Sequence, residues 1–159
     1  MTDPAPGDRA PAGARAYRVE ARASAPPEAV WPLLGEAERW REWTFLTRSD
    51  RVRDGHPDPD GVGAVRRFTR FGVGSREEVL AFEPPHHLAY RILSGFPVRN
   101  YRADVTLEED GGGTRITWTG TYDERWPGTA GVLGVVLGRM MQRFATDLAG
   151  HADAGQRPG

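Results

Sequence analysis

A long amphipathic helix is predicted for residues 129–151, TAGVLGVVLGRMMQRFATDLAGH, and this segment constrains the fold most. Its large apolar residues recur at intervals of three and four, and so share one helical face: Leu133, Leu137, Met140 or Met141, Phe144 and Leu148. Pro127 and Gly128 precede it, and Gly150 is placed to end it. The continuous apolar run of residues 130–137 is far shorter than the roughly 20 residues that cross a bilayer. The helix is therefore expected to cover a sheet of its own chain.

The segments that precede the helix supply that sheet. Apolar and polar residues alternate in several of them, as in half-buried strands. The predicted strands are residues 17–24, 46–54, 62–71, 73–82, 88–94, 101–108 and 114–123. Short turns rich in glycine join most of them, which favours antiparallel pairing. Two short helices, residues 25–35 and 36–43, follow the first strand. The order predicts an α+β fold with a sheet of about six to seven strands.

Length and composition limit the function. The 159 residues suit one domain, and the formal charge of −1 offers no general attraction for nucleic acid. All 21 basic residues are arginine and there is no cysteine, which excludes thiolate and Schiff-base chemistry. Residues 1–16 are rich in Pro, Gly and Ala and lack the apolar core of a secretory signal. We expect a disordered tail there, a domain over residues 17–151, a second tail over residues 152–159, and a cytoplasmic protein without integral membrane association.

No metal or cofactor site is predicted. Asp54, Asp58 and Asp60 resemble a calcium loop in composition, but they lack its spacing and its final glutamate. The histidines, which are His56, His86, His87 and His151, have no helical i, i+4 pair of the kind that binds zinc. His86 or His87 remains an alternative as a general base, although both lie in a predicted turn, where solvated side chains are common.

Aromatic residues and methionines dominate the predicted interior. They form the candidate ligand-binding set, which is Trp43, Phe45, Phe68, Tyr90, Ile92, Tyr101, Ala103, Trp118, Tyr122, Met140, Met141 and Phe144. One interpretation is a cavity with aromatic walls and adaptable methionine sulfur. The other is a filled core. The pattern leaves both open.

Two pairs of like charges face each other across a predicted hairpin, Arg66-Arg67 and Glu77-Glu78. Cross-strand ion pairs account for them. One member of each pair must also point to the concave side of the sheet, where it would anchor a polar ligand group. A slip of one residue in register exchanges the two members, so the sequence does not decide which one it is.

The order of elements and three segments together resemble the Bet v 1-like, START-related superfamily, also called polyketide cyclase/dehydrase or SRPBCC proteins. The segments are APPEAVWPLLGEAERWREW, EEVLAFEPPHHLAYRILSG and GGGTRITWTGTYD, and the likeness extends over residues 17–149. The resemblance implies a helix-grip fold, in which a strongly curved antiparallel sheet holds the C-terminal helix. It also implies an apolar cavity between sheet and helix, closed by the two short helices. The family includes ligand binders, lipid carriers and cyclases, and has no universal catalytic motif.

Three functional hypotheses follow. The leading one is binding of a hydrophobic or aromatic small molecule, such as a polyketide-like, isoprenoid or lipid compound, in the internal cavity. The alternative is a cyclase or dehydratase that acts on a poly-β-carbonyl substrate, with Tyr90 and Tyr101 as first catalytic candidates and Arg67 and Glu78 behind them. The third is a module that docks a protein partner through an exposed apolar opening. Both a monomer and a homodimer fit the sequence.

Overall fold

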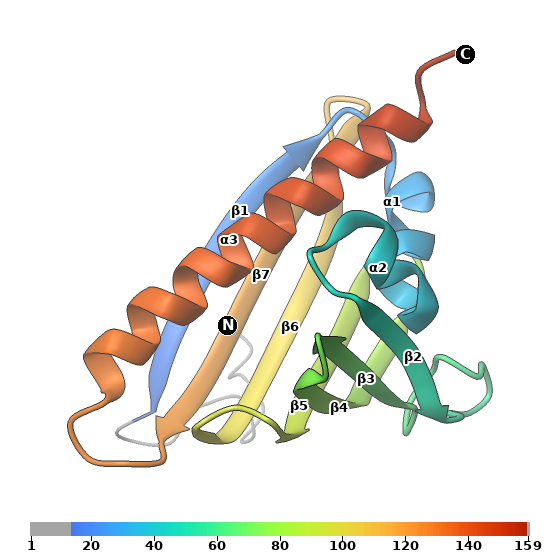
Figure 1. Ribbon diagram of the computed structural model, residues 1–159. Helices are drawn as coiled ribbons and strands as arrows, with labels where there is room; N and C mark the ends of the chain where they lie inside the picture. Colours follow the sequence, from blue (N-terminus) through green and yellow to red (C-terminus); the bar gives the residue numbers. More distant parts are fainter. Residues whose placement is uncertain (1–13, 159) are drawn as a thin grey trace, which may run out of the picture.

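The computed structural model describes residues 14–158 as a curved antiparallel sheet, short helical segments after the first strand, and a long C-terminal helix (Figure 1). The elements in chain order are β1 Arg15–Ala23, α1 Pro27–Gly35, the 3-10 turn η1 Ala37–Arg39, α2 Trp40–Trp43, β2 Arg48–Arg53, β3 Val65–Arg70, β4 Val73–Glu83, β5 His87–Ser94, β6 Val98–Asp110, β7 Gly113–Glu124 and α3 Ala130–Gly155. The predicted α+β helix-grip architecture is confirmed, with a sheet of seven strands.

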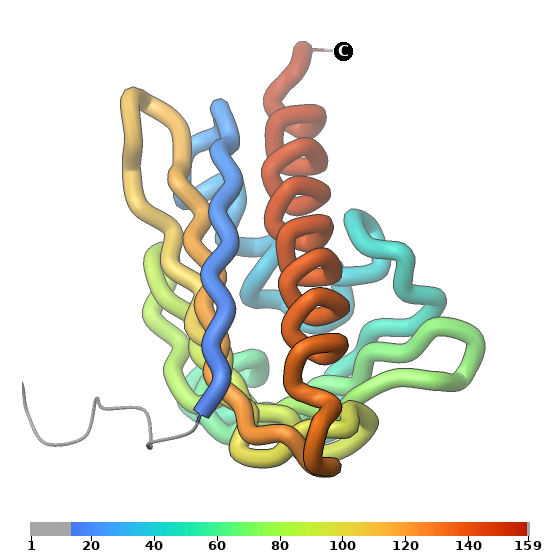
Figure 2. Tube along the Cα trace, turned by 90° about the vertical axis from the view of Figure 1, so that its left-hand side faces the viewer, coloured from blue at the N-terminus to red at the C-terminus, as the bar shows by residue number. Residues whose placement is uncertain are grey.

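The strand order, β1-β7-β6-β5-β4-β3-β2, puts the first two strands of the chain at opposite edges of the sheet. The segment 27–43 bridges that distance and covers one end of the interior. α3 packs chiefly against β1, with further contacts to β7 and α1. Figure 2 shows α3 (red) beside β1 (blue), with the sheet curving from β1 on one side of the helix to the green segment on its other side. Inward-pointing residues of β3, β4, β5 and β6 therefore face the middle of α3.

The predicted apolar face of α3 is confirmed, because Leu137, Met141, Phe144 and Leu148 are all buried. The prediction that Gly150 ends the helix is wrong: the helix continues to Gly155. Beyond Gly150, Ala152 is buried and a carboxylate oxygen of Asp153 accepts a hydrogen bond from the backbone N–H of Ala25 at 2.9 Å. These tertiary contacts outweigh the cost of about 1 kcal/mol that glycine imposes inside a helix.

The two ends of the predicted domain differ slightly from the structure. Strand β1 begins at Arg15, which pairs with Tyr122, so residues 15 and 16 belong to the sheet. Residue 14 precedes the strand, and residues 1–13 of the predicted N-terminal tail lie outside the described residues. The predicted C-terminal tail loses residues 152–155 to α3. Among the helices of residues 14–158, none has the length and apolar character needed to cross a membrane.

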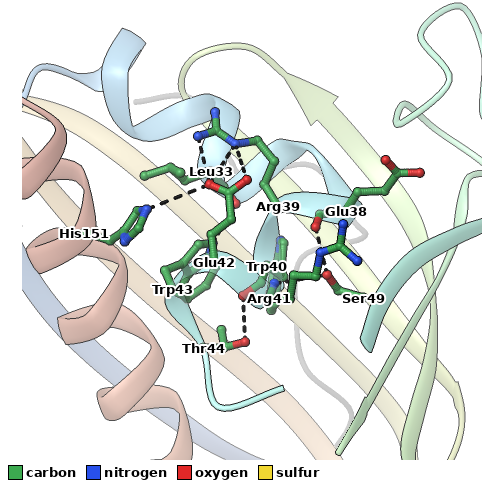
Figure 3. Close-up of polar contacts among 10 residues, drawn as sticks. All are labelled: Leu33, Glu38, Arg39, Trp40, Arg41, Glu42, Trp43, Thr44, Ser49 and His151. Carbon is green, nitrogen blue, oxygen red and sulfur yellow. Dashed lines mark hydrogen bonds and ion pairs between the residues drawn. The ribbon is translucent and has the colours of Figure 1, made fainter. Parts of the chain in front are cut away.

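Two tryptophans of α2 fix the two short helices to each other (Figure 3). The indole N–H of Trp40 donates to the carbonyl of Leu34 at 2.8 Å, and that of Trp43 donates to the carbonyl of Leu33 at 2.9 Å. Both rings are buried, so these bonds satisfy donors that would otherwise be costly to bury. Glu42 pairs with Arg39 on the surface nearby. The two indole hydrogen bonds thereby hold α2 in one orientation against α1.

Candidate functional site

A cavity of about 200 Å³ lies between the concave face of the sheet and α3. Its walls are mostly apolar, with Ser75, Glu77 and the two tyrosines as the inner polar groups. The lining residues are Trp40, Phe45, Leu46, Phe68, Arg70, Val73, Gly74, Ser75, Glu77, Tyr90, Ile92, Gly95, Phe96, Tyr101, Leu137, Met140, Met141 and Phe144. An apolar enclosure with few polar groups is the usual form of a small-molecule site.

Most of the predicted ligand-binding residues line this cavity. They are Phe45, Phe68, Tyr90, Ile92, Tyr101, Met140, Met141 and Phe144. The helix contributes its methionines and Phe144, the strands contribute the tyrosines and Ile92, and the α2–β2 connection contributes Phe45. The alternation of the strands and the helical period thus bring residues from five parts of the chain to one place.

Four predicted residues lie in the core and do not line the cavity: Trp43, Ala103, Trp118 and Tyr122. The Trp118 ring stands edge-on to Trp40, with 5.8 Å between ring centroids. Ala103 is completely buried on β6. Tyr122 is buried beneath the first half of α3, beside Gly134. These four residues belong to the same hydrophobic core as the cavity walls, but they do not border the open volume.

Several lining residues were missed by the sequence analysis, and they fall into two groups. Leu137 shares the helical face of Phe144, and Trp40 sits in a predicted short helix, so the periodic pattern contained their signal. Gly95 and Phe96 belong to the β5–β6 turn, where no periodicity exists. Gly95 has a φ of 101°, and a Cβ there would meet the carbonyl oxygen of Gly74 at 2.1 Å. Only glycine fits where the β5–β6 turn approaches the start of β4 so closely.

Each of the two phenols at the cavity has a hydrogen-bond partner in the core. The Trp118 indole N–H donates to the Tyr90 hydroxyl at 3.1 Å, and the Tyr101 hydroxyl contacts that of Tyr17 in a very short hydrogen bond. Burial raises the pKa of Tyr90 and of Tyr101 well above the ordinary value of 10.0, and the negative charge of Glu77 adds to the effect. Both tyrosines are therefore neutral at physiological pH, and both line the cavity.

An ion pair lies buried at the same end of the site. Arg66 of β3 and Glu77 of β4 are direct cross-strand partners, and Arg66 Nη2 donates to Glu77 Oε2 at 2.9 Å. The Arg66 side chain is 0% exposed, and its Nε and Nη1 atoms have no hydrogen-bond partner among the described residues. Burial raises the pKa of Glu77, and the Arg66 charge opposes that rise. Glu77 lines the cavity whereas Arg66 does not.

The guanidinium of Arg66 is enclosed by aromatic rings. Its central carbon lies 5.0 Å from the ring centroid of Trp40, 5.1 Å from that of Phe68 and 5.2 Å from that of Tyr90. The electron-rich faces of these rings partly replace the water that the cation has lost. Arg66 therefore orients the Glu77 carboxylate from the side that faces away from the cavity. The aromatic rings separate the guanidinium from the open volume.

The catalytic candidates Arg67 and Glu78 point to the opposite face of the sheet. Arg67 Nε donates to Asp50 on β2 at 3.0 Å, and Glu78 accepts from Arg91 on β5 at 2.9 Å. Arg67 also holds the pKa of Asp50 below its usual value through these hydrogen bonds. The other two candidates, Tyr90 and Tyr101, do line the cavity. The structure therefore separates the two pairs of candidates by the thickness of the sheet.

The histidines lie away from the cavity walls. His86 Nδ1 contacts the carbonyl of Leu107 at 3.1 Å, and His87 Nε2 contacts Asp104 at 2.8 Å. His151 on α3 faces Glu42 of α2 at 3.8 Å (Figure 3). Within residues 14–158, no group of three or more His, Cys, Asp or Glu side chains is arranged to hold a metal ion.

The rim of the cavity combines arginine with aromatic rings. Arg70 lines the opening, and its guanidinium carbon lies 5.4 Å from the Phe45 ring and 5.5 Å from the Phe71 ring. The guanidinium carbon of Arg143, on α3, lies 5.2 Å from the centroid of the same Phe45 ring. Phe71 is 80% exposed at the β3–β4 turn. The rim is thus more polar and more exposed than the interior.

Solved structures with the same fold share little sequence with this chain. XoxI from Bacillus cereus superimposes with a TM-score of 0.71 at 18% identity, over 91% of this chain and 99% of that one. Ara h 8.0201 gives 0.68 at 16% identity, over 89% and 99%. A protein from Thermus thermophilus gives 0.68 at 21% identity, over 90% and 100%. At such identities the likeness shows the fold alone.

A family model extends this likeness to sequence. Comparison with curated proteins gave no match. The model described as "Polyketide cyclase / dehydrase and lipid transport" matches residues 15–153, which is nearly the whole of the chain and includes every residue that lines the cavity. The chain therefore belongs to the polyketide cyclase/dehydrase and lipid transport family.

Proposed function

We propose that this protein binds a hydrophobic or aromatic small molecule in the cavity between the sheet and α3. The observation that carries the proposal is the cavity itself, about 200 Å³ in volume and walled by Trp40, Phe45, Phe68 and Phe144. Apolar surface of this kind gains free energy when a ligand removes it from water. The flexible side chains of Met140 and Met141 allow the wall on α3 to adapt to ligands of different shape. Polyketide-like, isoprenoid and lipid compounds are the candidate ligand classes for apolar walls of this kind.

The experiment is native mass spectrometry of the full chain, isolated gently from its own host. A bound ligand appears as an adduct of defined mass that leaves on denaturation. The matched variants are Ile92→Trp, which fills the cavity, and Leu93→Trp at the next position of β5, where the side chain is 46% exposed. We expect the adduct to disappear in the first variant and to remain in the second. An adduct that survives Ile92→Trp in a folded protein would place the ligand elsewhere.

A second candidate, a cyclase or dehydratase, has an observation of its own in its favour. Glu77 is a buried carboxyl group with a raised pKa in a cavity that Tyr90 and Tyr101 also line. In such a site a phenol polarises a substrate carbonyl and the carboxylate removes a proton from the adjacent carbon. The cavity would hold the poly-β-carbonyl chain in a reactive fold. Turnover by the purified protein that is lost in Tyr101→Phe, at unchanged stability, would support this candidate, and its absence across such substrates would count against it.

A further inference from the structure

The volume of the cavity limits the size of its ligand, and this argument rests on the proposed binding function. An apolar cavity of about 150 Å³ accommodates one benzene molecule. The present cavity, at about 200 Å³, is only moderately larger. It is smaller than the roughly 300–1,000 Å³ of typical drug-sized sites. This volume suits a ligand that consists of a single ring or of two fused rings. The cavity is too small to enclose a long acyl chain.

The wall formed by β4 carries hydrogen-bonding groups that are available to such a ligand. Ser75 and Glu77 are two positions apart on β4 and both line the cavity. Glu77 accepts one hydrogen bond within residues 14–158, from Arg66 to its Oε2 atom, and its Oε1 atom has no partner among them. The Ser75 hydroxyl, in a side chain that is buried, also has no partner in the described part of the chain. A ligand hydroxyl or N–H group would satisfy Oε1.

The charge of the site favours an uncharged ligand. A ligand carboxylate beside Glu77 would bring a second negative charge into an apolar enclosure, where like charges repel strongly. Arg66 cannot compensate, because Trp40, Phe68 and Tyr90 surround its guanidinium and it does not line the cavity. Arg70 does line the cavity, but its guanidinium lies at the rim, over the Phe45 and Phe71 rings. A cationic ligand would meet the positive charge of Arg66 directly behind Glu77. Only a neutral donor gains a hydrogen bond to the carboxylate without either repulsion.

The aromatic walls favour a flat ring over a branched aliphatic compound. Trp40 and Phe68 are stacked on each other with 4.5 Å between ring centroids, and both line the cavity. Phe45 and Phe144 lie 5.4 Å apart on the side of α3. Ring ligands gain offset-stacked or edge-to-face contacts with such walls beyond the burial of their area. From size, polarity and charge we infer that the cavity takes a compact, uncharged compound of one or two fused rings, whose hydroxyl or N–H group donates a hydrogen bond to Glu77 Oε1.

The test compares simple probes on the full chain by isothermal titration calorimetry at neutral pH. The probes are 2-naphthol, naphthalene, 2-methoxynaphthalene, 2-naphthoate and palmitate. A hydrogen bond to a charged acceptor that stands in an apolar site gives a preference of about tenfold. We therefore expect 2-naphthol to bind about tenfold more tightly than naphthalene or the methoxy compound. We expect 2-naphthoate and palmitate to bind more weakly than 2-naphthol.

Two double variants assign the preference to Glu77. Arg66→Met/Glu77→Leu replaces the buried pair by apolar groups, a change that cores often tolerate. In it, the preference for 2-naphthol over naphthalene should fall to about twofold or less. The matched control is Arg67→Met/Glu78→Leu, at the adjacent positions that face away from the cavity, and it should keep the tenfold preference. The comparison of probes on the unmodified chain stands even if the first double variant does not fold.

Each contrary result has a definite meaning. Equal binding of 2-naphthol and 2-methoxynaphthalene would overturn the donor to Glu77 and leave the proposed binding function intact. Tighter binding of palmitate would overturn the size limit in the same way. Tighter binding of 2-naphthoate that is lost in Arg70→Gln would locate an anion site at the rim and overturn the inference of a neutral ligand. No binding of any probe would overturn this inference, and the adduct found by native mass spectrometry would then decide the proposed function separately.

Discussion

The two faces of strands β3 and β4 carry ion pairs of the same chemical kind in opposite surroundings. On the concave face, Arg66 and Glu77 are 0% and 8% exposed and are joined to each other. On the convex face, the neighbouring Arg67 and Glu78 are paired outward, to Asp50 and Arg91 on the flanking strands. The outer pairs remain in contact with water, so their attraction is screened and removing one of them lowers the free energy of unfolding only slightly. The inner pair has lost that water, so removing one partner leaves an uncompensated buried charge.

The comparison teaches that position, rather than residue type, decides the role of these side chains. Alternation along a strand sends Arg66 and Arg67 to opposite faces, although they are identical and adjacent. The inner pair adds little net stability over an apolar pair of the same volume, because desolvation offsets the Coulomb attraction. Its presence beside a cavity therefore supports a functional role, which is the orientation of the Glu77 carboxylate.

The largest effect is expected when the inner pair loses its cation. Arg66→Met leaves the Glu77 carboxyl buried without a partner and removes three cation–aromatic contacts. The free energy of unfolding should fall by about 3–5 kcal/mol at neutral pH. The matched substitution on the outer face, Arg67→Met, should cost a small fraction of that. Urea denaturation of both variants measures the difference, and equal losses would show that the inner pair is not isolated from water.

A smaller change is expected when both inner partners become apolar. In Arg66→Met/Glu77→Leu no buried charge remains, and the side chains have similar volumes to those replaced. The double variant should regain the stability lost in Arg66→Met and reach a value between that of the unmodified protein and about 1–4 kcal/mol above it. Urea denaturation at neutral pH gives this value. A double variant less stable than Arg66→Met alone would mean that the pair itself stabilises the fold.

The two faces should also respond oppositely to pH. Burial holds the pKa of Glu77 in the folded state above its usual value of 4.5, which applies to the unfolded state. At any pH between the unfolded-state pKa and the folded-state pKa, the folded state therefore binds more protons than the unfolded state. The contribution of Glu77 to stability therefore decreases as pH rises through that window, by at most about 1.4 kcal/mol per pH unit. The hydrogen bonds from Arg67 hold the pKa of Asp50 below 3.8. The contribution of Asp50 is thus present above 3.8 and is lost as pH falls through its folded pKa.

Urea denaturation across the acid range, with Glu77→Gln and Asp50→Asn as references, separates these two contributions. The difference between the unmodified protein and Glu77→Gln should shrink or reverse as pH rises above 4.5. The difference between the unmodified protein and Asp50→Asn should grow as pH rises toward 3.8. A Glu77 contribution that grows with pH would show that attraction to Arg66 exceeds the cost of burial.

The same contrast between the faces explains what the sequence could and could not predict. Period-two alternation and glycine turns specified the strands, and the spacing of Leu137, Phe144 and Leu148 specified the buried face of α3. The choice between Arg66 and Arg67 depends on the register that pairs Arg66 with Glu77, and no local pattern encodes that parity. The distinction between cavity wall and core was also beyond the pattern. Tyr90 and Trp118 are both buried on the concave face, but only Tyr90 borders the open volume.

The smallest effect, and the one that most sharply separates the faces, is the response to salt. Arg91 is 54% exposed where it pairs with Glu78, so Arg91→Met should cost about 0.2–1 kcal/mol at low ionic strength. In about 1 M salt the Debye length falls to about 3 Å and that cost should vanish. The loss in Arg66→Met should remain, because ions cannot enter the space between Arg66 and Glu77. Denaturation of both variants at the two salt concentrations decides the point. If salt abolished the loss of unfolding free energy in Arg66→Met, solvent would have to reach the inner pair. The Glu77 carboxylate would then be hydrated, and the proposed selectivity of the cavity for a neutral donor would lose its basis.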